Sequence, residues 1–311
     1  MTAAEKRTFL LGGAALAAAA CLPIFDTGYW LSLGITIAMY TVLATSWALF
    51  SGPTHYIALS TAAFFGLGMY VVGGGIEILP FPVLVLIAGV AGALLSALIG
   101  LSTLRLSGVY FVIFTLGLTE LARELVTWVQ TTMGASSGLY VLTDITETII
   151  YWELLVMAAI VYVVGWAIRR SRLGFALRII GNDEVVAAHS GINTARAKVL
   201  LFVVSGVFAS VTGALVAPRW AYVEPIVAFS PMISFLVVIM ALLGGVHRLW
   251  GPLVGVVPFA LVWDLISAQF PNQTTILLGL SFLLIVYVIP NGFVGLIEKV
   301  LAKFRNGQGA S

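Results

Sequence analysis

The sequence predicts an all-α, polytopic membrane protein with about ten transmembrane helices. Of its 311 residues, 61% are hydrophobic and only 9% are charged, whereas soluble domains carry about 25% charged residues. The mean hydropathy is +1.10, so too few polar side chains exist to cover a soluble core of this size. The apolar runs are continuous rather than alternating, which favours helices over a β-barrel. We therefore expect one transmembrane domain over residues 1–311, with little mass outside the bilayer.

Ten apolar segments approach the roughly 20 residues that a helix needs to cross the hydrocarbon. The third is the weakest, and a re-entrant segment there would change the parity of the topology. The ten segments are Phe9–Phe25, Tyr29–Phe50, Ile57–Leu79, Phe81–Leu104, Val109–Gln130, Ile149–Ile168, Val199–Ala217, Pro231–Val246, Gly251–Phe270 and Thr275–Ile289.

The basic residues orient these segments, because cytoplasmic loops carry an excess of Lys and Arg. With both termini in the cytoplasm, all 15 basic residues except Arg123 and Arg219 fall on the cytoplasmic side. Ten spans therefore fit better than nine. The cytoplasmic set is Lys6, Arg7, Arg105, Arg169, Arg170, Arg172, Arg178, Arg196, Lys198, Arg248, Lys299, Lys303 and Arg305.

The first segment has a second interpretation. Lys6 and Arg7, an apolar stretch and the small residues before Cys21 resemble a signal peptide with a lipoprotein cleavage site. The usual branched residue three positions before the cysteine is absent, which favours a retained helix. Cleavage before Cys21 would leave the rest of the topology unchanged.

The ten segments divide into two groups of five, which would enter the membrane with opposite orientations. Inverted repeats of this kind are typical of transporters. The third segment of each half is rich in glycine and proline, as at Gly66 in the first and Gly244-Gly245 in the second. Such residues either allow close helix packing or interrupt a helix beside a pore. Both interpretations remain open from the sequence.

The stretch from Arg169 to Lys198 is the one large polar feature, and within it 171–197 is the predicted cytoplasmic loop. Leu177 and Ile180 recur at helical spacing among basic residues, which is typical of a helix lying at the membrane surface. A short helix of about eight residues follows, with Asn182 as N-cap and Gly191 as its stop. It is either a helix that inserts into a partner's groove or an ordinary surface loop.

Ionisable side chains within the spans are costly and are therefore candidate functional residues. Glu120, Arg123 and Glu124 share one helix face. They form either a self-neutralising cluster or, through Glu120, part of a solute path. Asp264 has no basic neighbour in sequence, so it needs a partner in another helix, water or a proton.

The composition and motifs exclude several functions. One cysteine and three histidines leave no disulfide and no metal cluster of recognised spacing. A net charge of +2 is too small for nucleic-acid binding. Phosphate-loop and Gly-x-Ser-x-Gly nucleophile motifs are absent from the sequence. We therefore expect no enzyme activity and no cofactor, and active transport would need ATP hydrolysis by a partner.

Several motifs, in order, resemble the LivM-like branch of branched-chain amino-acid ABC importer permeases. The loop resembles the ATPase-coupling loop of ABC permeases, although its acidic residue and its alanines are separated. The matching elements are Ala62–Gly66, Leu104–Tyr110 with Thr115–Gly117 and Glu120, Ser136–Leu139, Leu177–Lys198, Ser205-Gly206, Gly213–Leu215, Gly244-Gly245, Leu249–Pro252 and Pro290–Leu296. Residues 53–55, 60–61 and 246–248 depart from the family pattern, which puts the substrate in doubt more than the family.

The resemblance implies an inner-membrane permease subunit that works with a second permease, two ATP-binding subunits and an extracytoplasmic solute-binding protein. Branched-chain amino acids are the expected solute, and urea, amides and small organic acids are alternatives. The implied ATPase-coupling residues are Asp183, Glu184, Ala187, Ala188 and Gly191. The candidate residues of the translocation pathway are Phe64, Phe65, Gly66, Thr115, Glu120, Arg123, Gly244, Gly245 and Asp264. The alternative function is an ion- or proton-coupled secondary transporter that works alone.

Overall fold

The computed structural model describes residues 19–25, 28–103, 108–132, 138–182 and 184–288. Helices make up nearly all of this part of the chain. They are α2 (Leu22–Phe25), α3 (Tyr29–Thr54), α4 (Thr61–Gly75), α5 (Phe81–Thr103), α6 (Val109–Thr132), α7 (Glu147–Arg170), α8 (Arg172–Asn182), α9 (Glu184–His189), α10 (Thr194–Val216), α11 (Pro225–Ala228), α12 (Pro231–Gly244), α13 (Gly251–Gln269) and α14 (Thr274–Val288).

Each predicted span that the structure describes for most of its length contains a helix, which supports an all-α, polytopic membrane protein. Within the described ranges, six segments are long and apolar enough to cross a membrane: Tyr29–Thr54, Phe81–Thr103, Glu147–Arg170, Thr194–Arg219, Pro225–Gly244 and Gly251–Gln269. Most of the first predicted span lies outside the described residues, as does the loop element at Ser136-Ser137 and the motif at 290–296. The count of ten and the topology therefore stay predictions.

The third predicted span is where the structure differs most from expectation. Its helix, α4, has 15 residues, or about 22 Å, against about 30 Å of hydrocarbon. Residues 55–60 before it are not helical, because the left-handed backbone of His55 (φ 58°) ends α3. This short helix is buried in protein rather than exposed along its length.

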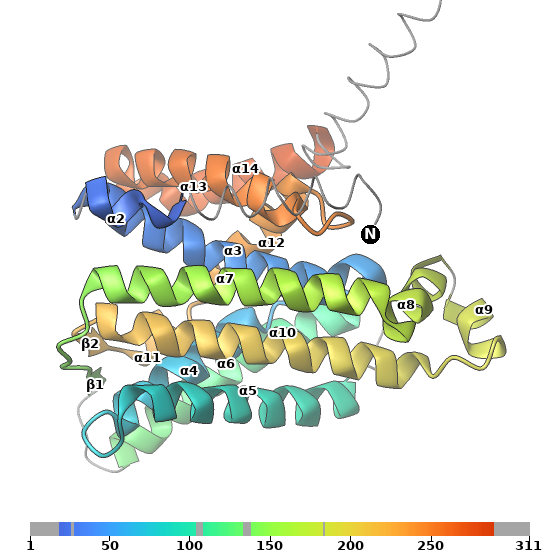
Figure 1. The fold of residues 1–311 in the computed structure, drawn as a ribbon, viewed down its shortest axis with the longest axis horizontal. Helices are drawn as coiled ribbons and strands as arrows, with labels where there is room; N and C mark the ends of the chain where they lie inside the picture. The colour runs from blue at the N-terminus through green and yellow to red at the C-terminus, as the bar shows by residue number, and fades with distance from the viewer. Residues whose placement is uncertain (1–18, 26–27, 104–107, 133–137, 183, 289–311) are drawn as a thin grey trace, which may run out of the picture.

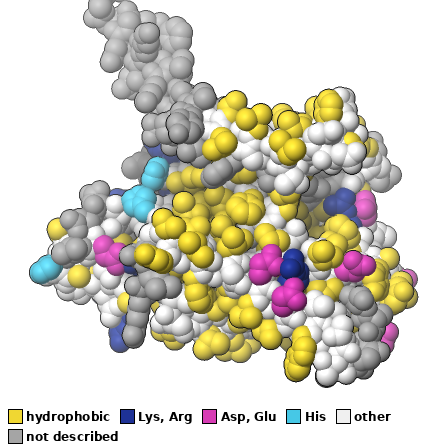
Figure 2. Space-filling model, turned by 180° about the vertical axis from the view of Figure 1, so that it is seen from behind, with side chains coloured by type: hydrophobic (Ala, Val, Ile, Leu, Met, Phe, Trp, Pro, Cys, Tyr) yellow, Lys and Arg dark blue, Asp and Glu magenta, His cyan; other side chains and the backbone are white. Residues whose placement is uncertain are grey.

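The long helices lie along the long axis of the molecule, with α8 and α9 at one end and two short strands at the other (Figure 1). The strands β1 (Leu139–Tyr140) and β2 (Tyr222–Val223) pair antiparallel, Leu139 opposite Val223. The sequence did not indicate them. Helix α10 packs against α3, α4 and α5, while α3 packs against α12 and α13. Hydrophobic side chains are spread over much of the face turned away in Figure 1, which suits contact with lipid (Figure 2).

Glycines allow helix backbones to touch. A Cβ at Gly68 of α4 would lie 1.8 Å from the carbonyl oxygen of Ser210 in α10, and one at Gly213 of α10 would lie 2.0 Å from that of Phe65. At Gly244 a Cβ would lie 1.9 Å from the carbonyl oxygen of Gly251. Close packing through small residues, one of the two interpretations of the glycine-rich segments, is therefore confirmed at these positions.

Candidate functional site

Helix α8 (Arg172–Asn182) follows α7 where the sequence predicted a helix at the membrane surface. Leu177 and Ile180 are buried, and Arg172 and Arg178 are exposed. The prediction that Asn182 caps the next helix was wrong, because Asn182 is the last residue of α8. Helix α9 (Glu184–His189) consequently has six residues rather than about eight. Asp183, between the two helices, lies outside the described residues.

The end of α9 was predicted correctly at Gly191. This glycine has a φ of +78°, its N–H donates to the Ala188 carbonyl (3.0 Å), and the N–H of Ile192 donates to the Ala187 carbonyl (3.1 Å). This pair of bonds is the Schellman motif, which needs a left-handed residue at the position of Gly191. The next helix, α10, begins immediately, with the Asn193 side chain accepting from the Arg196 N–H (2.9 Å).

The two alanines of α9 face opposite ways. Ala187 is fully buried, whereas Ala188 and His189 are exposed and Val186 is 54% exposed. The outer face of α9 is therefore slim, small and partly apolar. A face of this kind fits a shallow groove on a partner.

An ion pair holds α9 against the body of the protein. Lys198 of α10 is 2% exposed, and its ammonium pairs with the Glu184 carboxylate. It also donates to the Tyr56 hydroxyl (3.1 Å) and lies 4.3 Å from the centre of the Tyr56 ring. A buried charge needs such partners. The ammonium therefore links α9 to the segment that precedes α4.

The non-helical segment 55–60 obtains its hydrogen bonds from side chains of the surrounding helices. The Leu59 N–H donates to Thr115 Oγ1 (3.0 Å), and Thr119 Oγ1 donates to the Leu59 carbonyl (3.1 Å). Trp47 Nε1 donates to the Ala58 carbonyl (2.8 Å). Irregular backbone at membrane depth persists only when protein satisfies it in this way. Thr115, a predicted pathway residue, thus holds this segment in place.

Replacing Thr115 with valine should destabilise the protein, because the buried Leu59 N–H would lose its acceptor at nearly constant side-chain volume. Such a loss costs about 1–3 kcal/mol, which corresponds to a fall in Tm of about 2–10 °C. Thermal unfolding in detergent measures it. Thr131→Val on the same helix is the matched control, since Thr131 is exposed and bonds only to carbonyls of its own helix. Equal Tm values for the two variants would contradict this role of Thr115.

The charged candidates of the membrane spans each have their own partner. Arg123 pairs with Glu120 (2.7 Å) and Glu124 (3.0 Å) on α6, which is the self-neutralising cluster foreseen from the sequence. Asp264 of α13 accepts a hydrogen bond from the Tyr29 hydroxyl of α3, so it does find a partner in another helix. These contacts do not join the two groups into one site.

The remaining pathway candidates lie in the packed interior. Phe64 and Phe65 are 2% and 3% exposed, and a Cβ at Gly66 would meet the Phe229 ring at 2.5 Å. Gly244 and Gly245 are buried at the end of α12, where Gly245 has a φ of +108°.

Sequence reasoning did not identify Lys198, Tyr56, Trp47, Thr119 or Ser234 as parts of this arrangement. The Ser234 hydroxyl of α12 accepts from the Ala62 N–H (2.9 Å) at the start of α4. A signal was present for Lys198, since it directly precedes a long apolar run and has no solvent route once α10 packs. No comparable signal marked the others, because their partners are distant in sequence.

Comparison of the sequence with known proteins identifies a family that it matches. The family described as "Branched-chain amino acid transport system / permease component" matches residues 29–289. The branched-chain amino acid permease protein LivM of Escherichia coli K12 is 23% identical over 337 residues, 97% of this chain and 78% of LivM. LivH of the same strain is 31% identical over 136 residues, 43% of this chain and 44% of LivH. The ribose import permease protein RbsC of Haemophilus influenzae is 23% identical over 142 residues, 44% of each chain.

The chain thus spans less than half of the length of LivH and of RbsC. No solved structure matches the chain. The family match extends from the first residue of α3 to just beyond α14 and includes α8, α9 and the segment 55–60. Together with the six apolar helices, it makes the protein a multi-pass inner-membrane protein. The chain therefore belongs to the family of permease components of branched-chain amino acid transport systems.

Proposed function

We propose that this chain is a transmembrane permease subunit of an ATP-driven ABC importer and forms half of the translocation pathway. The observation that carries the proposal is α9, a small helix with an exposed outer face that is attached by an ion pair to the buried ammonium of Lys198 in α10. A free surface loop has no need of such an anchor. A helix that transmits a movement of a partner to the membrane spans needs a firm attachment to them, because a flexible loop would not transmit that movement.

The packing of the long helices supports two inverted halves. Helix α10 of the second half packs on α4 and α5 of the first half. Its counterpart in the first half, α3, packs on α12 and α13 of the second half. A non-helical stretch precedes the short helix of each half, at residues 55–60 before α4 and at 220–224 before α11 and α12. This exchange is the pattern expected of an inverted repeat. It favours the ten-span topology with both termini and α8–α9 in the cytoplasm.

The partners follow from the chemistry that the chain lacks and from its relatives. ATP hydrolysis would occur on two cytoplasmic subunits, and their movement would push α9, the proposed coupling helix. A second permease would complete the pathway, and an extracytoplasmic binding protein would deliver the solute. LivH and LivM are both named as branched-chain amino acid permeases. We therefore propose a branched-chain amino acid or a related amino acid or amide as the solute.

The contacts suggest how a push on α9 would reach the membrane interior. Glu184 of α9 would move Lys198 and, through it, Tyr56. Tyr56 begins the segment that Thr115 and Thr119 hold in place, and that segment leads into α4 with Phe64, Phe65 and Gly66. A coupling step acts only through contacts that differ between the two transport states. We place those differing contacts at segment 55–60.

Reconstitution tests the proposal. The chain, co-expressed with its partner permease and ATPase subunits, should accumulate branched-chain amino acid in proteoliposomes only with ATP and binding protein. The same chain reconstituted alone is the control, with and without a proton or sodium gradient. Gradient-driven accumulation by the chain alone would instead establish the secondary transporter, with Glu120 and Asp264 as its coupling sites.

A further inference from the structure

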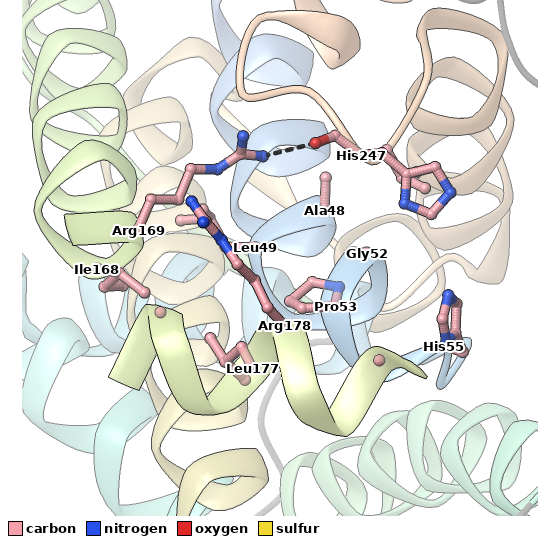
Figure 3. Close-up of a pocket in the computed structure, with 13 residues that line it drawn as sticks. Ala48, Leu49, Gly52, Pro53, His55, Ile168, Arg169, Leu177, Arg178 and His247 are labelled. Carbon is pink, nitrogen blue, oxygen red and sulfur yellow. Dashed lines mark hydrogen bonds between the residues drawn. The ribbon is translucent and has the colours of Figure 1, made fainter. Parts of the chain in front are cut away.

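A cationic pocket lies where α3, α7, α8 and the α12–α13 connection meet, and neither α9 nor the segment 56–60 contributes to it. Its volume is about 450 Å³. The floor is apolar, with Ala48, Leu49 and Leu177 buried, while Arg169, Arg178, His55 and His247 reach over it (Figure 3). A pocket with an apolar floor and basic walls can take an amphipathic, anionic ligand.

The positive charges of the pocket are close together and are not neutralised by described carboxylates. Arg169 lies near enough to Arg178 and Arg248 to be repelled by both. Its guanidinium donates to the carbonyl oxygen of His247 (3.1 Å). Among the described residues, neither Arg169 nor Arg178 has an acidic partner. Holding like charges together costs free energy, and an anion between them would recover it.

The backbone brings two distant segments to the pocket. His55 is the one non-glycine residue of the described ranges with a positive φ, and its ring lies 6.1 Å from that of His247. These residues belong to 53–55 and 246–248, two of the three segments that depart from the family pattern. Strained backbone positions persist where the surroundings or a ligand hold them. Two of the three departures thus meet at this pocket, which suggests a property particular to this chain.

The position of the pocket indicates the source of the anion. Arg169 stands at the end of α7, the point at which that span leaves the hydrocarbon. Exposed apolar side chains form a row along α7 at helical spacing, from Trp152 through Val156 and Ile160 to Val163, and the same spacing continues to Arg170, the residue next to Arg169. Acyl chains lying on such a stripe would place a lipid headgroup at the level of the pocket. Basic pockets at this depth bind phosphate headgroups.

We propose that this pocket binds the phosphate group of an anionic phospholipid, with Arg169 and Arg178 as its main ligands. Guanidinium groups suit phosphate oxygens because they donate paired hydrogen bonds in a fixed geometry. His55 and His247 form the opposite wall. A bound lipid would join α7 and α8 to the α12–α13 connection. The shared chemistry is a phosphate ester, which a soluble phosphate would also offer, so the test separates the two sources.

The test uses the purified full chain in detergent and native mass spectrometry. The probes are palmitoyl-oleoyl-phosphatidylglycerol, the matched phosphatidylcholine and inorganic phosphate. We expect the wild type to retain phosphatidylglycerol in preference to phosphatidylcholine, and R169Q/R178Q to bind it at least about tenfold more weakly. The control R172Q/R196Q removes the same charge from exposed positions outside the pocket and should bind as the wild type does.

Several outcomes would overturn the proposal. They are equal losses in both double variants, no preference for phosphatidylglycerol, or binding of inorganic phosphate without binding of the lipid. Loss of the ATPase subunits from R169Q/R178Q with lipid binding unchanged would assign the pocket to partner docking instead. If the double variant does not fold, R178Q alone decides, since Arg178 makes no side-chain hydrogen bond within the described structure.

Discussion

Replacing Ala188 with arginine should abolish transport and release the ATPase subunits. Ala188 is exposed on α9 while Ala187 beside it is buried, so the new side chain would project outward without disturbing the core. In the proposed complex, the arginine side chain would prevent the partner's groove from contacting α9, which has only six residues. A central position of this kind contributes about 2 kcal/mol or more to binding, or about 30-fold in affinity. We expect uptake to fall to background.

Co-purification of the ATPase subunits with the tagged permease measures this effect. Ala268→Arg is the matched control, because Ala268 is an exposed alanine in the last turn of α13, outside α9. The control should bring down the ATPase subunits in wild-type amounts. An Ala188→Arg complex that stays intact and transports normally would show that α9 is not the docking element. The bilayer insertion and yield of both variants should match the wild type.

Replacing Glu184 with glutamine should detach α9 while leaving the spans folded. The Lys198 ammonium, 2% exposed, would lose its anionic partner and keep only neutral ones, which are the Tyr56 hydroxyl and ring and the amide oxygen of the new glutamine. Breaking a buried pair by removing one partner costs about 3–5 kcal/mol. Since the Glu184 side chain is 43% exposed, solvent screening reduces this to about 1–3 kcal/mol. We expect the amides of residues 184–192 to exchange hydrogen about ten- to a hundredfold faster.

In the reconstituted complex, the same variant should let the ATPase subunits hydrolyse ATP without a proportionate transport of solute. The solute transported per ATP hydrolysed is the measurement, and it separates lost coupling from lost assembly. The double variant E184Q/K198M should recover much of the exchange protection, because no unpaired charge remains buried. Glu77→Gln, at an exposed site between α4 and α5, is the control. A double variant no better protected than E184Q would show that the ion pair does not anchor α9.

The sequence predicted those parts of the fold that depend on local patterns. Apolar length located α3, α5, α7 and α13, and glycine chemistry located the stop at Gly191. The cap at Asn182 was wrong because α8 continues through that residue, so two helices meet where one helix start was expected. Asn193, which does cap a helix, has the same side-chain chemistry. Local propensity gives the capacity to cap, and the tertiary path of the chain decides which residue does so.

The long-range contacts to which we assign coupling were beyond local reasoning. Lys198 and Tyr56 are separated by 142 positions, and Ala62 and Ser234 by 172. No periodicity connects such pairs. The sequence did show that a short helix with a small surface stood among basic residues. It did not show that the helix is bound to α10, or that 53–55 and 246–248, two of the segments that depart from the family pattern, lie side by side.

The short length of α4 has a consequence for biogenesis. A 15-residue apolar helix that does not match the bilayer thickness is poorly held by lipid alone. Gly68 of α4 packs against the Ser210 carbonyl of α10, a helix that begins only at Thr194 and leaves the ribosome much later. We therefore expect that α4 reaches its final position in the membrane only after α10 has been synthesised and has packed against it.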